Sequence, residues 1–188
     1  MPRIVLRKGS ASDLSFLWEM LHLSIYTPPG EMPPSRDILT YPAVEKYMRD
    51  WGRDGDFALL AVEGVEGVEG VEGVEGVEGV EGVEGLRPIG AIWMRQFFET
   101  EKGYGFVDED TQEIGMAILP KYRHQGIGRK LLGELCREAR SLGYAAISLS
   151  VDPHNLPALR LYESDGFVKV YEDTGGSWTM KKVLPAAE

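Results

Sequence analysis

The segment from Glu113 to Gly143 runs from a strand through a glycine-containing turn into an amphipathic helix. Glu113–Leu119 is a short apolar stretch that Pro120 ends, as expected of a buried strand. Apolar residues then recur at helical spacing from Ile127 onwards, and Gly143 is placed to end that helix as a C-cap. A strand that leads through a tight turn into a helix needs a sheet on which the helix can pack. This segment therefore predicts an α/β fold.

The rest of the chain supplies further strands and helices in mixed order. One helix is predicted from the Ser10–Asp13 cap to about Tyr26 and a second over Val44–Trp51, with the proline-rich loop Thr27–Pro34 between them. A short helix follows over Asn155–Glu163. The predicted strands are Ile4–Arg7, Asp56–Ala61, Pro88–Met94, Glu113–Leu119, Ala145–Val151, Phe167–Glu172 and Ser177–Val183. Together they indicate a mixed central sheet of about six or seven strands.

Composition narrows the class of protein further. The chain has 188 residues, of which 43% are hydrophobic and 27% charged, which is typical of one ordinary domain. Its apolar stretches are far shorter than the roughly 20 residues that span a bilayer, and the N-terminus lacks the apolar run of a signal peptide. We therefore expect a cytoplasmic protein without a membrane segment. A single cysteine, Cys136, and three histidines at unrelated spacings predict neither a disulfide framework nor a metal site.

Residues 62–85 are eight copies of Val-Glu-Gly. A period of three matches neither helix nor strand geometry, so we interpret this repeat as a low-complexity loop that lengthens the hairpin between the second and third predicted strands. A collagen-like helix is disfavoured because proline is missing, and a regulatory or calcium-binding acidic arm is the remaining alternative. The repeat holds eight of the 30 acidic residues, and the other 22 nearly balance the 20 basic ones. A basic surface for nucleic acid therefore has no support.

The turn that opens the long helix has the features of an anion site. Backbone N–H groups and the positive end of the helix dipole meet there. Gly126 and Gly128 would let a diphosphate approach the backbone, and Arg123, Arg129 and Lys130 supply positive charge. The segment lacks the lysine–serine or lysine–threonine pair of a P-loop and the third glycine of a dinucleotide-binding fingerprint. A different class of phosphate ligand is indicated, although an ordinary strand-to-helix connection is the alternative.

Two motifs carry a resemblance to a known family. Arg123-x-x-Gly126-x-Gly128 resembles the acyl-CoA pyrophosphate motif of the GNAT superfamily of N-acetyltransferases. The second signature of that superfamily is N-x-x-A-x-x-L-Y-x-x-x-G-F. This chain matches it with Asn155, Ala158, Leu161, Tyr162, Gly166 and Phe167. The close match covers about residues 113–170. It implies one N-acetyltransferase domain over residues 1–188, with helices on both faces of the sheet and a splayed pair of strands at the fourth and fifth positions.

The resemblance also implies a cosubstrate, acetyl-CoA, and the residues that hold it. Asn155 would bind the pantetheine arm, and Arg123 would lie near the diphosphate. Backbone groups would complete the site: those for the pantetheine and the thioester carbonyl belong to Met116, Ala117, Ile118 and Leu119, and those for the pyrophosphate to Gln125, Gly126, Ile127, Gly128 and Arg129.

Direct acetyl transfer in a ternary complex needs a base for the amine and an acid for the thiolate. Tyr162 fits the acid, because a phenol is protonated at neutral pH. By resemblance Glu113 is the candidate base, and burial would raise its pKa toward the useful range. Each has an ordinary alternative: Tyr162 as a core residue and Glu113 as a solvated strand end. Cys136 and His124 are expected to have no catalytic role.

The sequence does not define the amine acceptor. The family usually builds this site from regions that correspond to Tyr26–Ile38, Phe97–Gln112 and Thr174–Trp178, with Tyr26, Tyr104, Glu113 and Trp178 as candidate contacts. A small molecule, a peptide or a protein lysine would each fit, and a homodimer through the last strands is compatible with the resemblance. A non-catalytic acyl-CoA-binding regulatory module is the runner-up function, and a structural domain without a ligand is a third class.

Overall fold

One mixed sheet of seven strands, in the order β1-β2-β3-β4-β5-β7-β6, organises the described part of the chain, residues 4–64 and 86–185 of the computed structural model. Neighbouring strands are antiparallel except β4 and β5, which are parallel. The strands are β1 Ile4–Lys8, β2 Phe57–Glu63, β3 Arg87–Arg95, β4 Gln112–Ile118, β5 Ala146–Val151, β6 Val168–Glu172 and β7 Trp178–Val183. The α/β class and the mixed sheet predicted from the sequence are confirmed.

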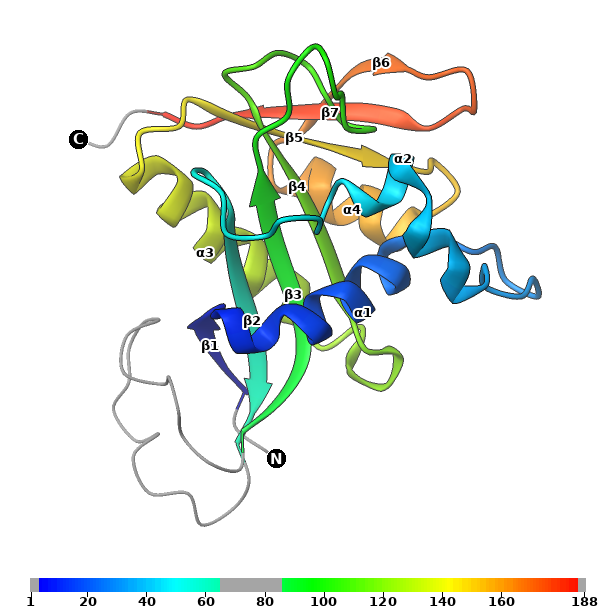
Figure 1. The fold of residues 1–188 in the computed structure, drawn as a ribbon, viewed down its shortest axis with the longest axis vertical. Coiled ribbons are helices and arrows are strands. Elements are labelled where there is room, and N and C mark those ends of the chain that lie inside the picture. The colour runs from blue at the N-terminus through cyan, green and yellow to red at the C-terminus, as the bar shows by residue number, and fades with distance from the viewer. Residues whose placement is uncertain (1–3, 65–85, 186–188) are drawn as a thin grey trace.

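Helices cover both faces of this sheet (Figure 1). One face packs on α1 and α2, with Leu17, Met48 and Trp93 in its core. The other packs on α3 and α4, with Leu131 and Tyr162 in its core. The α-helices are α1 Leu14–Ser24, α2 Pro42–Glu45, α3 Ile127–Ser141 and α4 Leu156–Ser164, and the shorter 3₁₀ helices are η1 Ala11–Asp13, η2 Arg36–Thr40 and η3 Pro120–Tyr122. Because side chains alternate across a strand, neighbouring residues of β4 face different cores.

The strands β4 and β5 pair only at their start and then separate. Gln112 lies opposite Ile147 and Glu113 opposite Ser148, and no later pair joins the two strands within the described residues. β4 stays paired with β3 as far as Ile118, so it is the contact with β5 that is lost. The splay expected at the fourth and fifth strands is therefore present, and it opens the sheet between its two faces.

The helix predicted over Val44–Trp51 is wrong except for its first two residues, which belong to α2. α2 ends at Glu45, and the chain continues in turns to Asp50, whose φ of 52° breaks any helix. The carbonyl of Lys46, which a continuing helix would bond to the N–H of Asp50, accepts a hydrogen bond from the Arg95 side chain instead. A buried arginine from another strand thus replaces the local helical bond.

Two smaller differences concern ends and loops. α1 ends at Ser24 rather than near Tyr26, because Ile25 is extended. Most of the Val-Glu-Gly repeat lies outside the described residues, although its first Val-Glu pair ends β2 and the chain resumes as β3 at Arg87, paired with Glu63. Among the described residues, no helix is both long and apolar enough to cross a membrane.

Candidate active site

A cavity of about 490 Å³ lies where β4 and β5 separate. Ile114, Gly115 and Met116 of β4 form one wall, and Ser150 and Val151 of β5 form the opposite one. Other elements close it: α1, η2 and α2 from one face, α4 from the other, and the loops before β4 and between β6 and β7. The gap in the sheet is therefore the feature that creates the site.

Glu113 lies in this cavity on the face that α1 covers, and it is 3% exposed. Its Oε1 accepts hydrogen bonds from the Tyr47 hydroxyl at 2.6 Å and from the Gly105 N–H at 2.8 Å. Its Oε2 is buried without a hydrogen-bond partner among the described residues. Gly103 covers this oxygen so closely that a Cβ there would overlap the carboxylate. Oε1 thus has two hydrogen-bond donors from the protein, whereas Oε2 has none among the described residues.

Burial is the main cause that raises the pKa of Glu113 to about 7, because it disfavours the charged form. The Tyr47 and Gly105 hydrogen bonds and the nearby Lys46 charge act in the opposite direction. Lys46 itself has a lowered pKa, since it too is partly buried. A carboxylate with a pKa near neutral can both accept a proton and release it at the pH of a cell. Glu113 is therefore a buried group and not a solvated strand end.

Tyr162 reaches the same cavity from the opposite face of the sheet. It belongs to α4, is 7% exposed, and packs against Phe167 at a ring-centroid distance of 5.6 Å. Burial raises its pKa to about 12. The hydroxyl is therefore protonated throughout the neutral range, as the sequence predicted. Glu113 and Tyr162 face one cavity from two faces only because the strands between them diverge.

The start of α3 has free backbone donors. Among the described residues, no hydrogen bond is found for the N–H groups of residues 124–129. His124 and Gly126 have positive φ angles of 62° and 78°, and a Cβ at Gly126 would meet nothing within 4 Å. The conformation and the open space agree with close approach of an anion. Arg123 lies beside this turn and donates to the Ile118 carbonyl at 3.0 Å, and Arg129 to the Ser164 hydroxyl at 3.4 Å.

Gly128 has a different surrounding from the one expected. A Cβ there would lie 3.2 Å from Leu161 and 3.4 Å from Ile118, so the missing side chain makes room for packing between α3, α4 and β4. Gln125 donates its side-chain amide to the Lys121 carbonyl at 3.1 Å. Ile127 is buried in the core on the α3 face. Of the two glycines, only Gly126 has open space over its Cα.

The backbone N–H and C=O groups of successive β4 residues point alternately toward β3 and toward the gap. The N–H of Leu119 donates to the Ile89 carbonyl and its carbonyl accepts from the N–H of Tyr122, so both groups are used. Because alternate residues of an antiparallel pair point to the partner strand, Ala117 faces β3 as well, whereas Met116 and Ile118 face the gap. Of the four residues expected to offer backbone groups, only Met116 and Ile118 direct them into the gap, and the Ile118 carbonyl there accepts from Arg123.

The expected acceptor regions reach the cavity only in part. Tyr26, Ile38 and Tyr104 line it, as do Gly175 and Ser177 from the loop between β6 and β7. Trp178 does not; the Lys169 ammonium lies over its ring, 4.0 Å from the centroid. Asn155 lines the cavity, and its side chain also accepts the N–H of Ala158 at 3.4 Å, which caps α4.

Residues 77–167 match the family model described as "Acetyltransferase (GNAT) family", and both sequence motifs fall inside this range. Residues 77–167 belong to the GNAT family. The match contains β3, β4, α3, β5 and α4, and hence the gap in the sheet, Glu113 and Tyr162. The N-terminal residues that cover Glu113 lie before the matched range.

Two curated relatives carry the names of N-acetyltransferases. Over 61 residues the chain is 43% identical to the ribosomal protein bS18-alanine N-acetyltransferase of Escherichia coli strain K12, a match that covers 32% of this chain and 40% of that protein. Over 70 residues it is 31% identical to "GCN5-related N-acetyltransferase 4, chloroplastic" of Arabidopsis thaliana, covering 37% of this chain and 24% of that protein. The chain thus spans less than half the length of these relatives.

Solved structures extend the likeness to the whole fold. A GNAT acetyltransferase from Staphylococcus aureus MU50 superposes with a TM-score of 0.64 at 16% identity, covering 97% of this chain and 100% of the other. A Salmonella typhimurium protein solved with its cofactor acetyl-CoA gives a TM-score of 0.60 at 18% identity, over 99% and 96% of the two chains. The chain has the GNAT fold.

Sequence reasoning missed the groups that surround Glu113 in this GNAT fold. Tyr47 donates to Glu113 and accepts the N–H of Tyr104 at 2.6 Å, so it links the carboxylate to the loop before β4. The N–H of Gly105 completes the cradle, and a Cβ on that residue would lie 2.5 Å from the backbone of Leu149. A contact between residues 47 and 113 has no local periodic signal, which is why the pattern could not show it.

Proposed function

We propose that this chain is an N-acetyltransferase that moves the acetyl group of acetyl-CoA directly to a primary amine in a ternary complex. The observation that carries the proposal is the meeting of Glu113 and Tyr162 in one cavity, from opposite faces of the sheet. The family of residues 77–167 and the names of the curated relatives support N-acyl transfer, and the structural relative solved with acetyl-CoA supports the cosubstrate.

Acetyl-CoA would supply the activated acetyl group. The residues present fit it on two observations. N–H groups at residues 124–129 are free beside Arg123, and along the gap lie the outward backbone groups of Met116 and the N–H of Ile118, whose carbonyl accepts from Arg123. Asn155, which lines the cavity, is proposed to bind the pantetheine arm through its side-chain amide. The phosphate end and the thioester end would thus lie along one groove from the start of α3 to the cavity.

In the proposed reaction Glu113 takes the proton of the amine, whose nitrogen forms a bond to the thioester carbonyl carbon. The carbon–sulfur bond then breaks, and Tyr162 gives its hydroxyl proton to the departing thiolate. The products are the acetylated amine and free CoA, and solvent restores the proton of Tyr162 and removes that of Glu113. A neutral pKa for the base and a protonated phenol for the acid are the states that these steps require.

The first test is thermal unfolding with and without acetyl-CoA, with free adenosine nucleotides as the control. A ligand at 100 times its dissociation constant adds about 2.7 kcal/mol to the free energy of unfolding, which moves the midpoint measurably. A shift specific to acetyl-CoA is expected. No shift at millimolar acetyl-CoA would contradict the proposal.

Turnover is tested next with a panel of amines and Tyr162→Phe. The variant keeps the ring that packs on Phe167 and loses the proton, so kcat should fall by at least about tenfold while acetyl-CoA affinity is unchanged. Equal losses in both would indicate a packing role. Binding of acetyl-CoA without acetylation of any amine would favour the alternative, a non-catalytic acyl-CoA-binding module. A homodimer and a cytoplasmic location stay predictions from the sequence.

A further inference from the structure

Arg95 is a charged side chain inside the core. It ends β3, is 1% exposed, and donates from Nε and Nη2 to the two Asp56 oxygens at 2.7 and 2.5 Å. Asp56 is equally buried, so the two charges offset each other. The Trp51 ring lies against the guanidinium, 5.1 Å from its carbon to the ring centroid. The side chain is therefore held in one orientation.

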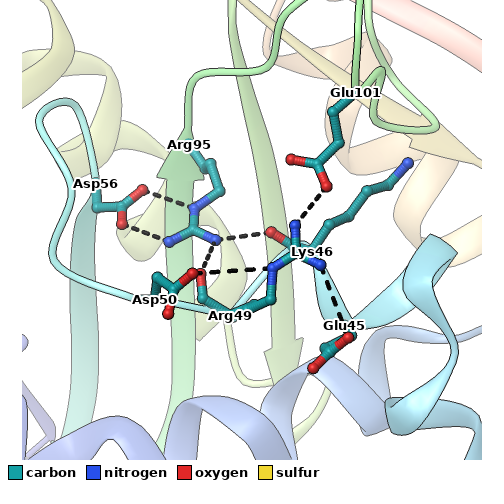
Figure 2. Close-up of polar contacts among 7 residues, drawn as sticks. All are labelled: Glu45, Lys46, Arg49, Asp50, Asp56, Arg95 and Glu101. Carbon is teal, nitrogen blue, oxygen red and sulfur yellow. Dashed lines mark hydrogen bonds and ion pairs between the residues drawn. The ribbon is translucent and has the colours of Figure 1, made fainter.

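The remaining donor of Arg95 holds a turn of another element. Nη1 donates to the Lys46 carbonyl at 2.7 Å and to the Arg49 carbonyl at 2.8 Å, as Figure 2 shows. These are carbonyls that α2 leaves without helical partners when it ends at Glu45. Backbone carbonyls that lack a helical partner need another donor, and here one guanidinium nitrogen bonds to both. Arg95 thus fixes the turn at two points, on either side of Tyr47.

The turn held in this way faces Glu113. Tyr47 donates to Glu113 Oε1, and Lys46 reaches the Lys102 carbonyl in the loop that covers the carboxylate. Arg95 is the register partner of Glu113 across β3 and β4, so the two side chains project from the same face of the sheet. The guanidinium and the carboxylate therefore lie on the same face, and the turn after α2 makes hydrogen bonds to both.

We propose that Arg95, clamped by Asp56, is a positioning residue of this site: by holding the Lys46 and Arg49 carbonyls it keeps the Tyr47 hydroxyl on Glu113. That Glu113 acts as a base rests on the proposed function. The placement of Tyr47 by Arg95 does not, and it is measured separately below.

A purely stabilising role for Arg95 makes a different prediction about the Glu113 carboxyl. The groups that act on its pKa are Tyr47 and Lys46 from the held turn and the Gly105 N–H from the loop, while burial acts against them. The Arg95 charge is offset by Asp56. Releasing the turn removes hydrogen bonding and positive charge from the ionised carboxylate, so Glu113 should keep its proton to higher pH. A residue that only stabilises the fold would leave this titration unchanged in Arg95→Lys, which keeps the charge that offsets Asp56.

The experiment is a ¹³C NMR titration of the Glu113 carboxyl in the full chain, with its resonance identified by its loss in Glu113→Gln. Arg95→Met and Tyr47→Phe should each move the midpoint upward by about one pH unit, and the double variant should move it by less than the sum of the two shifts, because the Tyr47 hydrogen bond can be lost only once. Arg7→Met is the control, because Arg7 also makes a two-pronged pair with a buried aspartate, Asp13, but contacts neither the turn nor Glu113.

Arg95→Lys keeps the charge beside Asp56 but lacks the planar fork that reaches both carbonyls, so it covers the case in which Arg95→Met fails to fold. It should shift the midpoint in the same direction. An unchanged Glu113 titration in a folded Arg95 variant, or an equal shift in Arg7→Met, would overturn the proposal. The titration needs no turnover, so a protein that acetylates no amine would refute the proposed function and leave this inference standing.

Discussion

Two demands meet at Glu113. The base role proposed for it requires an ionised carboxylate, yet this carboxyl is buried under Gly103 and has one oxygen without a partner among the described residues. Burial alone would push its pKa far upward; the Tyr47 and Gly105 donors on the other oxygen and the Lys46 charge bring it back to about 7. The pKa of Glu113 thus reflects two opposing effects. Burial raises it, and the three groups supplied by the covering loop and the turn after α2 lower it.

That balance predicts a pH dependence of stability. Unfolded, Glu113 has the ordinary value of 4.5, so between pH 4.5 and about 7 the folded protein binds more protons than the unfolded chain. Stability from this residue is therefore complete below pH 4.5 and is lost as pH rises through 7. Glu113→Gln removes the titration. The unfolding free energy of wild type minus that of Glu113→Gln should fall by about 3 kcal/mol over this range.

Denaturant unfolding at closely spaced pH values measures this difference directly. The activity should mirror it, because kcat/KM needs the ionised carboxylate and should rise with pH to a plateau above about 7. A flat stability difference from pH 4 to 8 would show that Glu113 titrates normally.

Gly126 permits a matched test of the anion site. Asn and Asp have the same shape, and both tolerate the left-handed φ that this residue adopts, so Gly126→Asn and Gly126→Asp differ only in charge. The Asp carboxylate would lie in open space beside free N–H groups, where it competes with a phosphate. Calorimetry should show acetyl-CoA affinity at least about tenfold lower for the Asp variant than for the Asn variant. Equal affinities would place the pyrophosphate elsewhere.

At the scale of elements, patterns that depend on neighbours in sequence were reliable. The amphipathic stripe of α3, its Gly143 terminus with a φ of 86°, and the apolar runs of β2 to β5 were all placed to within a few residues. The turn after α2 failed, because Arg95 supplies its carbonyl partners from a distant strand. Tyr47 was missed for the same reason, since its role depends on Glu113. Local periodicity predicts elements, whereas long-range polar contacts decide where they end.

Substitution by alanine should change the stability of the protein in opposite directions at two glycines, one in α3 and one in the loop before β4. Gly133 is inside α3, and a Cβ added there would meet nothing within 4 Å, so Gly133→Ala should raise the unfolding free energy by about 1 kcal/mol through helix propensity. Gly105 touches the backbone of β5, with a Cβ at 2.5 Å from Leu149 and 2.7 Å from Ser150, so Gly105→Ala should lower it by about 2 kcal/mol.

Thermal or denaturant unfolding distinguishes these outcomes, and acetyl-CoA affinity separates their causes. Gly133→Ala should bind as wild type. Gly105→Ala must displace the loop that donates to Glu113, so its effect on turnover should exceed its effect on acetyl-CoA binding. A neutral Gly105→Ala would mean that the loop does not rest on β5 in solution.

At the scale of the whole molecule, the sheet divides the work between its faces. α3 with its preceding turn and α4 carry the two motifs and the proposed anion site, while α1, α2 and the loop before β4 surround Glu113. The matched range begins at residue 77, so the N-terminal half of this second face lies outside it. This division explains why the sequence suggested a cosubstrate but left the acceptor open: the segments around Glu113 share no motif.

The Val-Glu-Gly repeat provides the last prediction at this scale. β2 and β3 pair through Glu63 and Arg87 at the end of the hairpin, and the Tyr122 hydroxyl donates to the Glu63 carboxylate there, so the joint is tied to the chain before α3. Deleting seven of the eight copies shortens the repeat eightfold, which on the logarithmic dependence of loop closure on length relieves about 2 kcal/mol. The shortened chain should therefore unfold at a higher temperature with unchanged kcat/KM. A replacement of the repeat by glycine–serine of equal length is the control. If this replacement matches wild type and only the deletion loses activity, the length of the connection matters. If both variants lose activity, the acidic sequence itself has a function.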